Sequence, residues 1–382
     1  MPKTIYLDNN ATTPVDPRVL TEMLPYFSEK FGNPASRSHV YGWESEEAVD
    51  IAKENIATLI GAHPHEIVFT SGATEAINLA IKGLLETQNR KNHIITTQTE
   101  HKAVLDVCAK LESQAIEITY LPVNSGGTID IKELEKAIKP NTGLICILYA
   151  NNETGVIQPI AQIGSIAKQN KIPFFTDATQ AVGKIPVQVT TDGIDMLCMS
   201  AHKLYGPKGV GVLFIRKNQS DFNITAQIEG GGHQLGLRSG TLNVPGIVGL
   251  GEACKIAGVE LEIEQNRLST LRNQFERALV EMDGITINGN NSPRLPHCTN
   301  ITIEGIDGEK FILNLGSKIA FSQSSACTSA TIQPSHVLLA MGLQKDAIQN
   351  SFRFSFGRFN TEKEVEQAIL LLKQTITQHR NQ

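Results

Sequence analysis

The chain has 382 residues, of which 41% are hydrophobic and 19% are charged, a composition typical of a globular protein with two or three domains. Its 34 Lys and Arg against 39 Asp and Glu give a net charge of −5, which disfavours strong binding to nucleic acid and direct binding to anionic membranes. No stretch approaches the ~20 apolar residues of a membrane span, and the N-terminus lacks the apolar segment of a secretory signal, so we expect a cytoplasmic protein.

Short apolar runs alternate with helical patterns through the first part of the chain. Helical patterns over 74–85 and from about 103 follow the first two of these runs. Strands joined by helices predict a mostly parallel sheet that is covered on both faces. The turn at 206–209 is short enough for a hairpin, which would make the sheet mixed. The β-branched and aromatic content predicts strands over residues 66–70, 93–97, 144–149, 172–176, 196–200 and 211–215.

The last third of the chain changes to a mixed pattern, which we interpret as a smaller α+β domain. The pair Thr361 and Glu364 forms a capping box at the start of the last helix. We therefore expect a large domain over 14–256 and a small domain formed by 1–13 and 257–382. The predicted elements of this part are a long amphipathic helix, a strand, a helix, a strand and a last helix, over residues 257–282, 299–304, 308–315, 350–355 and 361–378.

Polar residues follow the predicted strands where they end. Ligands of open parallel sheets bind outside the carboxyl ends of the strands, so these residues mark a candidate site. The turn from Ser71 to Thr74 offers backbone N–H groups and a hydroxyl at the start of a helix, which can hold a phosphate. The same small residues are also typical of a plain turn. His101 and Asn152 follow the next two strands and are equally compatible with structural roles.

Two charged residues follow the next predicted strands. Asp177 comes after an apolar run, where a carboxylate is costly unless it is paired with a cation; the alternative is a helix N-cap. Lys203 follows another apolar strand, and a desolvated lysine suits Schiff-base chemistry; the alternative is a surface or ion-paired lysine. Together, a phosphate cradle, an anion, an imidazole, an amide and an amine at one sheet edge suit pyridoxal phosphate.

One cysteine stands apart from the others. The chain has 6 cysteines without a CxxC pair, which favours reduced thiols and predicts no metal site. Cys327 lies in a run of small polar residues, about 321–331, that burial would not anchor, so we expect a flexible loop. A thiol on such a loop is a candidate nucleophile; the alternative is an incidental exposed cysteine. The other five cysteines are expected to be structural.

Arg353 is the last candidate site residue. On the predicted strand 350–355 it alternates with Phe352 and Phe354, which places it on the opposite face. A strand-held arginine can bind a substrate carboxylate through its two-pronged guanidinium, and the alternative is an interdomain salt bridge.

Short motifs occur along the chain in a fixed order: YLDNNATTP (6–14), FGNP (31–34), TSGATE (70–75), TEHKAV (99–104), NNETG (151–155), DATQ (177–180), SAHK (200–203), RSGT (238–241) and SACTS (325–329). With these motifs the chain resembles the group I cysteine desulfurases from about residue 4 to residue 379. The resemblance implies a fold-type I pyridoxal-phosphate enzyme of the class V aminotransferase family, usually a homodimer. It also implies an α/β fold, in which a large domain with a mostly parallel seven-stranded sheet joins a smaller α+β domain.

The resemblance further implies a role for each candidate residue. Lys203 would form the Schiff base with the cofactor and later move the α-proton of the substrate. His101 would stack on the ring and act as an acid–base group, and Cys327 would accept the sulfur. Asn152 and Arg353 would bind the carboxylate of L-cysteine. The remaining cofactor-binding residues would be Ala73, Thr74, Asp177, Gln180, Ser200, His202 and, from the partner subunit, Thr241.

The implied reaction converts L-cysteine to L-alanine and leaves a persulfide on Cys327 for a protein acceptor. The sulfur would serve iron–sulfur cluster assembly, tRNA thiolation or DNA phosphorothioation. Three features depart from many relatives: Gln234-Leu235 in place of Glu-Arg, Gln323 in a run that lacks the usual glycine, and a chain end at Gln382 without a scaffold-docking tail. The last weakens the expectation of the iron–sulfur scaffold pathway and leaves room for a nitrogenase-type or DNA phosphorothioation-type role. Alternatives are a selenocysteine lyase, another fold-type I enzyme such as an aminotransferase, and a non-catalytic sulfur-relay protein.

Overall fold

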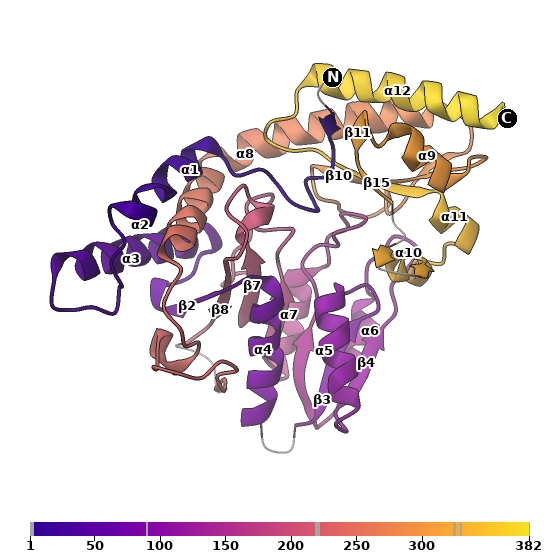
Figure 1. The fold of residues 1–382 in the computed structure, drawn as a ribbon. Helices are drawn as coiled ribbons and strands as arrows, with labels where there is room; N and C mark the ends of the chain where they lie inside the picture. The colour runs from indigo at the N-terminus through magenta and orange to yellow at the C-terminus, as the bar shows by residue number, and fades with distance from the viewer. Residues whose placement is uncertain (1–3, 89–90, 218–221, 324–325, 329–330, 382) are drawn as a thin grey trace.

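The largest feature of the fold is a seven-stranded sheet in the order β2-β8-β7-β6-β5-β3-β4, which confirms the predicted α/β class (Figure 1). The computed structural model describes residues 4–88, 91–217, 222–323, 326–328 and 331–381. β8 runs antiparallel to β2 and β7, and the other described pairs are parallel, so the predicted mixed sheet and hairpin are confirmed. The strands are β2 (Ile67–Thr70), β3 (His93–Thr97), β4 (Glu117–Leu121), β5 (Thr142–Cys146), β6 (Phe174–Asp177), β7 (Met196–Ser200) and β8 (Gly211–Ile215).

Three strands of the large sheet differ from the prediction by two residues or more at one end, or were not predicted. β4 was missed because it is an edge strand whose side chains, apart from Leu121, are exposed or half-buried, so its pattern lacks an apolar run. β5 ends at Cys146 although 144–149 was predicted, but Tyr149 N–H still donates to the Asp177 carbonyl at 2.9 Å and keeps the segment extended. β6 begins at Phe174 because Pro173 has no N–H for the ladder.

Helices cover both faces of the sheet, and each strand contributes to two cores. Along β7, Met196 and Cys198 pack under helices α4 (Ala73–Thr87) and α5 (Lys102–Glu112). Leu197 and Met199 point to the other face. This alternation is the two-residue period of a strand that is buried on both sides. The other face is covered by α3 (Val40–Ile60), α6 (Ile131–Ala137), α7 (Ile160–Gln169) and the first half of α8 (Val244–Val280). Helix α1 (Pro17–Met23) packs against α8, and α2 (Pro25–Ser28) lies next to α1.

The C-terminal part has its own sheet and core, shown in orange and yellow in Figure 1. Phe352, Phe354 and Phe356 share one buried face, as predicted. The capping box of Thr361 and Glu364 is also confirmed. The elements are β9 (Ile285–Ile287), β10 (Cys298–Ile303), β12 (Ser322–Gln323) and β15 (Ser351–Ser355) in one sheet, β1 (Ile5–Tyr6) paired with β11 (Ile319–Ala320), the hairpin of β13 (Ala326–Thr328) and β14 (Thr331–Gln333), and helices α9 (Gly308–Leu315), α10 (His336–Ala340), α11 (Lys345–Gln349) and α12 (Glu362–Arg380).

Helix α8 is 37 residues long and joins the two cores. Its predicted start at 257 is wrong, because the first turns from Val244 are apolar on all sides and show no amphipathic period. Its residues up to Ala257 belong to the core of the large sheet, and those from Leu268 belong to the smaller core. We propose that the two domains meet at 256/257, because α8 passes from one core to the other beyond this position.

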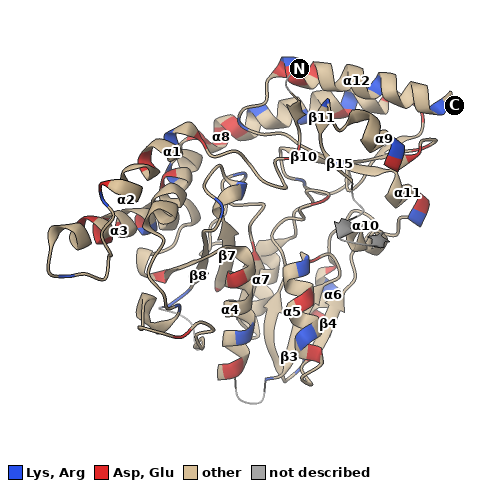
Figure 2. Ribbon diagram, in the orientation of Figure 1, with Lys and Arg blue, Asp and Glu red and all other residues tan. Residues whose placement is uncertain are grey.

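Acidic and basic residues are mixed along the helices of the molecule. Figure 2 shows acidic and basic residues interspersed on α1, α8 and α12 rather than separated. Within the described ranges, none of the helices has both the length and the apolar character needed to cross a bilayer.

Candidate active site

A cavity of about 690 Å³ opens at the carboxyl ends of β6 and β7, beside the start of α4. This is the sheet edge at which ligands of open α/β folds bind. Although the residues predicted for the site are far apart in the sequence, the fold brings most of them to this one cavity. The predicted residues that line it are Ala73, Thr74, His101, Asn152, Asp177, Gln180, Ser200, His202, Lys203 and Arg353.

Lys203 lies at the end of a single 3-10 turn, Ala201–Lys203, that directly follows β7. Its Nζ donates to the carbonyl oxygens of Asn10 and Ala11, each at 2.6 Å. Burial, and after it the positive charge of Arg353, lower the pKa of Lys203 to about 8. The amine is therefore closer to its neutral, nucleophilic form than a surface lysine would be.

Asp177 ends β6 and is 8% exposed. Its Oδ1 accepts from the Thr179 backbone N–H at 3.0 Å and from the Cys198 thiol at 3.4 Å. Among the described residues, no lysine, arginine or histidine forms an ion pair with this carboxylate. A buried carboxylate of this kind is stabilised when a cationic group of a ligand pairs with it.

The start of α4 provides hydrogen-bond donors for an anion. Its N-cap is Gly72, which has no side chain to cap the first-turn N–H groups. The hydroxyl groups of Thr74 and Ser200 belong to residues of the same cavity lining. His202 lies beside them, and its Nδ1 is 3.1 Å from the Thr12 hydroxyl. Burial lowers the pKa of His202 to about 4, so the imidazole is neutral at pH 7.

Gln180 and His101 also line the cavity, and each is held by a hydrogen bond. Gln180 Nε2 donates to the Asn10 carbonyl at 3.1 Å, the same oxygen that binds Lys203. His101 is the N-cap of α5, where its Nδ1 accepts from the Ala103 N–H at 3.1 Å. Because Nδ1 is an acceptor in this contact, the neutral ring carries its proton on Nε2.

Arg353 lies on β15 and reaches the cavity from the smaller core. Its Nη1 donates to the Asn152 carbonyl at 3.0 Å. Its Nη2 donates to Asp8 at 2.6 Å and to the Ser322 hydroxyl at 3.0 Å. Asp8 belongs to the same predicted domain as Arg353, so this ion pair is not the interdomain bridge considered from the sequence.

Two further predicted site residues are Cys327 and Thr241. Cys327 is on β13, opposite Ile332 on β14, and its side chain lies outside the described part of the structure. The sequence predicted a loop here, but residues 326–328 and 331–333 pair as strands, which suits their β-branched Thr and Ile. Thr241 is exposed and lies outside the cavity lining. The other five cysteines are buried, as predicted.

Comparisons with known proteins bear on the family of the chain. Residues 5–368 match the aminotransferase class-V family. A cysteine desulfurase of Klebsiella pneumoniae, IscS, is 50% identical over 375 residues, which are 97% of this chain and 92% of that protein. A human cysteine desulfurase is 48% identical over 367 residues, 96% of this chain and 80% of that protein. The chain belongs to the cysteine desulfurases of the aminotransferase class-V family.

Solved structures place this desulfurase in the same fold. A NifS-like protein superimposes with a TM-score of 0.89 at 40% identity, covering 98% of this chain and 99% of that one. SspA in complex with cysteine superimposes with a TM-score of 0.83 at 39% identity, covering 94% of this chain and all of that one, 100%. The predicted fold-type I architecture is thereby confirmed.

The family uses pyridoxal phosphate, and the residues present fit that cofactor. Asp177 offers a buried carboxylate for the protonated pyridine nitrogen, and Lys203 offers an amine of lowered pKa for the aldehyde. The uncapped start of α4 suits the phosphate. Among the described residues, no group of three His, Cys, Asp or Glu side chains is placed to hold a metal ion.

The N-terminal segment of this desulfurase takes part in the site, although no single motif indicated this. Asn10, Ala11 and Thr12 line the cavity and contact Lys203, Gln180 and His202. The segment lies within the motif YLDNNATTP, which supported the family resemblance without pointing to a role. Its contacts join residues that are about 170 to 193 positions apart, so no local pattern could have revealed them.

Proposed function

We propose that this chain releases sulfur from L-cysteine, producing L-alanine and a persulfide on Cys327. The observation that carries the proposal is that Lys203, Asp177 and Arg353 meet in one cavity at the carboxyl edge of the sheet. An amine of lowered pKa, a buried carboxylate and a fixed guanidinium are the groups needed to bind an amino acid beside pyridoxal phosphate. Bound at Lys203 and Asp177, that cofactor supplies an electron sink for the substrate carbons.

The roles of the chain's own residues follow from their places. Arg353 and Asn152 hold the substrate carboxylate, and the Lys203 amine takes the α-proton. The Cys327 thiolate attacks the substrate sulfur, so an S–S bond forms while the Cβ–S bond breaks and its electron pair stays on carbon. Cβ then takes a proton, and a proton is returned to Cα; these two transfers, by Lys203 or His101, complete L-alanine.

Two substitutions test the proposal. Cys327→Ala should retain the visible absorbance of the bound cofactor and lose sulfide release in the presence of dithiothreitol. Lys203→Ala should lose both the lysine-dependent absorbance and alanine formation. Cys254→Ala is a control, because Cys254 is a buried core residue of α8 and should leave both signals in place. Undiminished sulfide release by the Cys327→Ala protein would refute the assignment of the sulfur acceptor.

The active unit is proposed to be a homodimer in which Thr241 of one subunit completes the cofactor site of the other. Large apolar side chains on α2, α3 and the connection between them support this, because they are exposed in the single chain. Phe27 is 63% exposed, Phe31 65% and Trp43 51%. Sedimentation equilibrium should give twice the chain mass, and Trp43→Asp should shift the equilibrium toward the monomer.

The persulfide on Cys327 is proposed to pass to an acceptor protein in the cytoplasm, for one of the sulfur-using processes named above. A persulfide transfers by exchange with an acceptor thiolate, so the acceptor is expected to carry a reactive cysteine. Incubation with sulfur-35-labelled L-cysteine in extract of the native host should label one acceptor, and the Cys327→Ala protein should label none.

A further inference from the structure

The guanidinium of Arg353 donates hydrogen bonds to three protein groups, although binding a substrate carboxylate would not require them. Its side chain is 10% exposed, and two of its nitrogens already donate to protein groups. Nη1 donates to the Asn152 carbonyl, and Nη2 donates to Asp8 and to the hydroxyl of Ser322. Nε is buried and, among the described residues, has no hydrogen-bond partner. A buried N–H without a partner is costly unless a ligand supplies the acceptor.

Asp8 is itself firmly placed. Its backbone pairs with Ser355 at the end of β15, two residues beyond Arg353, and its carbonyl accepts from the Tyr6 hydroxyl at 3.1 Å. Its Oδ1 accepts from the Ser322 hydroxyl at 2.9 Å in addition to Arg353. Asp8, Ser322 and Arg353 thus form a closed triangle of hydrogen bonds, which restricts rotation of the guanidinium.

The charge of Asp8 also balances that of Arg353 at the neighbouring amine. Arg353 lowers the pKa of Lys203, whereas Asp8 and Asp177 raise it. A guanidinium without Asp8 would therefore place an unbalanced positive charge in the cavity beside the reactive amine.

We propose that Asp8 is a positioning residue for the carboxylate subsite: with Ser322 it occupies Nη2 of Arg353 and orients the guanidinium so that Nε is left for the carboxylate of L-cysteine. This inference rests on the proposed function, since it assumes that Arg353 binds the substrate. It adds a residue to that site and gives a reason for the unpartnered Nε. Asp8 touches neither cofactor nor substrate in this arrangement and acts through Arg353.

The test compares two substrates on the holoenzyme: L-cysteine and L-cysteinamide, in which a neutral amide replaces the carboxylate. Asp8→Asn should lower kcat/KM for L-cysteine about tenfold to a hundredfold, mainly through KM, because a charge-assisted hydrogen bond that orients the fork is weakened. For L-cysteinamide the value should stay within about twofold. Ser322→Ala should show the same selectivity with a smaller effect, and it decides the question if Asp8→Asn does not fold.

A control variant separates this role from a general loss of structure. Asp195→Asn makes the same change at another arginine ion pair, with Arg216 at 3.7 Å and outside this cavity, and should leave both substrates unchanged. Equal losses on both substrates in Asp8→Asn, or no loss on either, would overturn the inference.

A different experimental result would show that the proposed function itself is wrong. Arg353→Lys should remove the preference for L-cysteine over L-cysteinamide. If this variant keeps the preference, the carboxylate assignment of Arg353 is wrong and the inference fails with it. If Arg353→Lys loses the preference while Asp8→Asn and Ser322→Ala keep it, only the role of Asp8 is overturned.

A spectroscopic titration gives a second, independent readout. The visible absorbance of the holoenzyme is followed against pH, which reports the protonation of the nitrogen contributed by Lys203. Asp8→Asn should move the midpoint to lower pH, because it removes a negative charge that favours the protonated form. An unchanged or raised midpoint would contradict the electrostatic part of the inference.

Discussion

Burial sets the protonation state of individual side chains around the cavity. Glu100 directly precedes His101, is fully buried, and receives hydrogen bonds on Oε1 from the Leu148 N–H at 2.8 Å and the Thr97 hydroxyl at 3.1 Å. Its Oε2 has no partner among the described residues. Burial raises the pKa of Glu100 to about 8, so its carboxyl is protonated at neutral pH. This residue therefore adds no charge beside Asp177.

The raised pKa of Glu100 predicts a pH-dependent stability. Because the pKa is higher in the folded state than the usual 4.5, the stabilising effect of the proton is complete below that value and is lost as pH rises to about 8. Glu100→Gln stays neutral, so between pH 5 and pH 9 its free energy of unfolding should rise relative to that of the wild type by about 4 kcal/mol. Urea unfolding at several pH values measures this, and parallel curves would contradict it.

At the scale of elements, close contact between helices α3 and α8 fixes one edge of the large core. Gly251 of α8 lies against the backbone of Ala52 in α3. A Cβ at Gly251 would lie 2.6 Å from the Cα and 2.7 Å from the Cβ of Ala52, too close for any side chain. Gly258, seven residues further along α8, would meet only Leu59 at 3.7 Å. Close packing therefore requires a glycine at 251 but not at 258.

Alanine at these two positions should have opposite effects. Gly251→Ala forces α3 and α8 apart and should lower the free energy of unfolding by about 1–3 kcal/mol. Gly258→Ala meets no clash and should raise it by about 0.5–1 kcal/mol, because alanine favours the helix. Chemical denaturation of both variants measures the difference. Equal effects would show that the close approach to Ala52 does not limit packing.

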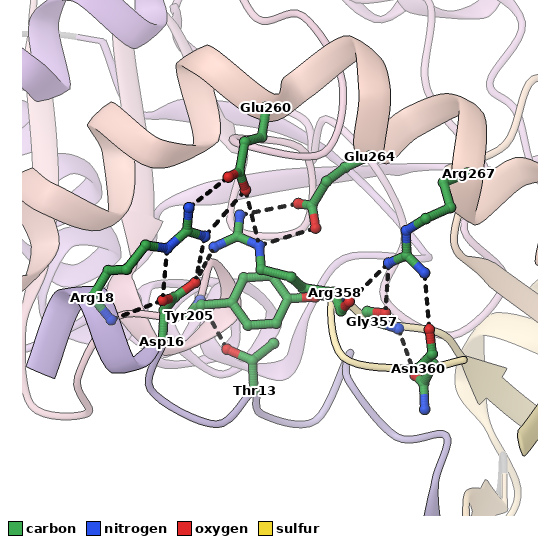
Figure 3. Close-up of polar contacts among 10 residues, drawn as sticks. All are labelled: Thr13, Asp16, Arg18, Tyr205, Glu260, Glu264, Arg267, Gly357, Arg358 and Asn360. Atoms are coloured by element: carbon green, nitrogen blue, oxygen red, sulfur yellow. Dashed lines mark hydrogen bonds and ion pairs between the residues drawn. The ribbon is translucent and has the colours of Figure 1, made fainter.

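At the scale of the whole molecule, a buried ion-pair network joins the two cores (Figure 3). Arg358, which follows β15, pairs with Asp16 at 2.7 Å and with Glu264 of α8 at 3.0 Å. Its backbone N–H donates to the Tyr205 hydroxyl at 2.6 Å. Tyr205 stands two residues after Lys203 and has a positive φ of 66°, a strained conformation that its neighbours must maintain. The network thus supports the turn that carries the reactive amine.

Removing the central cation should be far more costly than removing a peripheral one. Arg358→Met leaves the buried Glu264 without its partner and leaves Asp16 with Arg18 alone, so it should lower the free energy of unfolding by about 3–5 kcal/mol. Arg18→Met is the matched control: Arg18 pairs with the same Asp16, but its side chain is 50% exposed, so the loss should stay below about 1 kcal/mol. Urea denaturation compares them, and similar losses would refute the central role of Arg358.

The order of strands and helices was largely predictable because local period and capping decide it. β7 (Met196–Ser200) and α9 (Gly308–Leu315) begin and end where the pattern placed them, and the capping box of Thr361 predicted the start of α12. The start of α8 and the strand β4 were not predicted, and both for the same reason, which is the way each element is buried. The first turns of α8 are buried on all sides, and β4 is an edge strand, so neither shows the period of a half-buried element.

By itself, the sequence determined which reactive groups are present, that they follow the ends of parallel strands, and which family they resemble. Only the tertiary structure decided what surrounds them: Asn10 beside Lys203, Asp8 beside Arg353, and the burial that lowers the pKa of the lysine. The reason is physical. Strand and helix patterns reflect neighbours a few residues away, whereas charge balance and burial depend on groups hundreds of residues distant that meet only when the chain has folded.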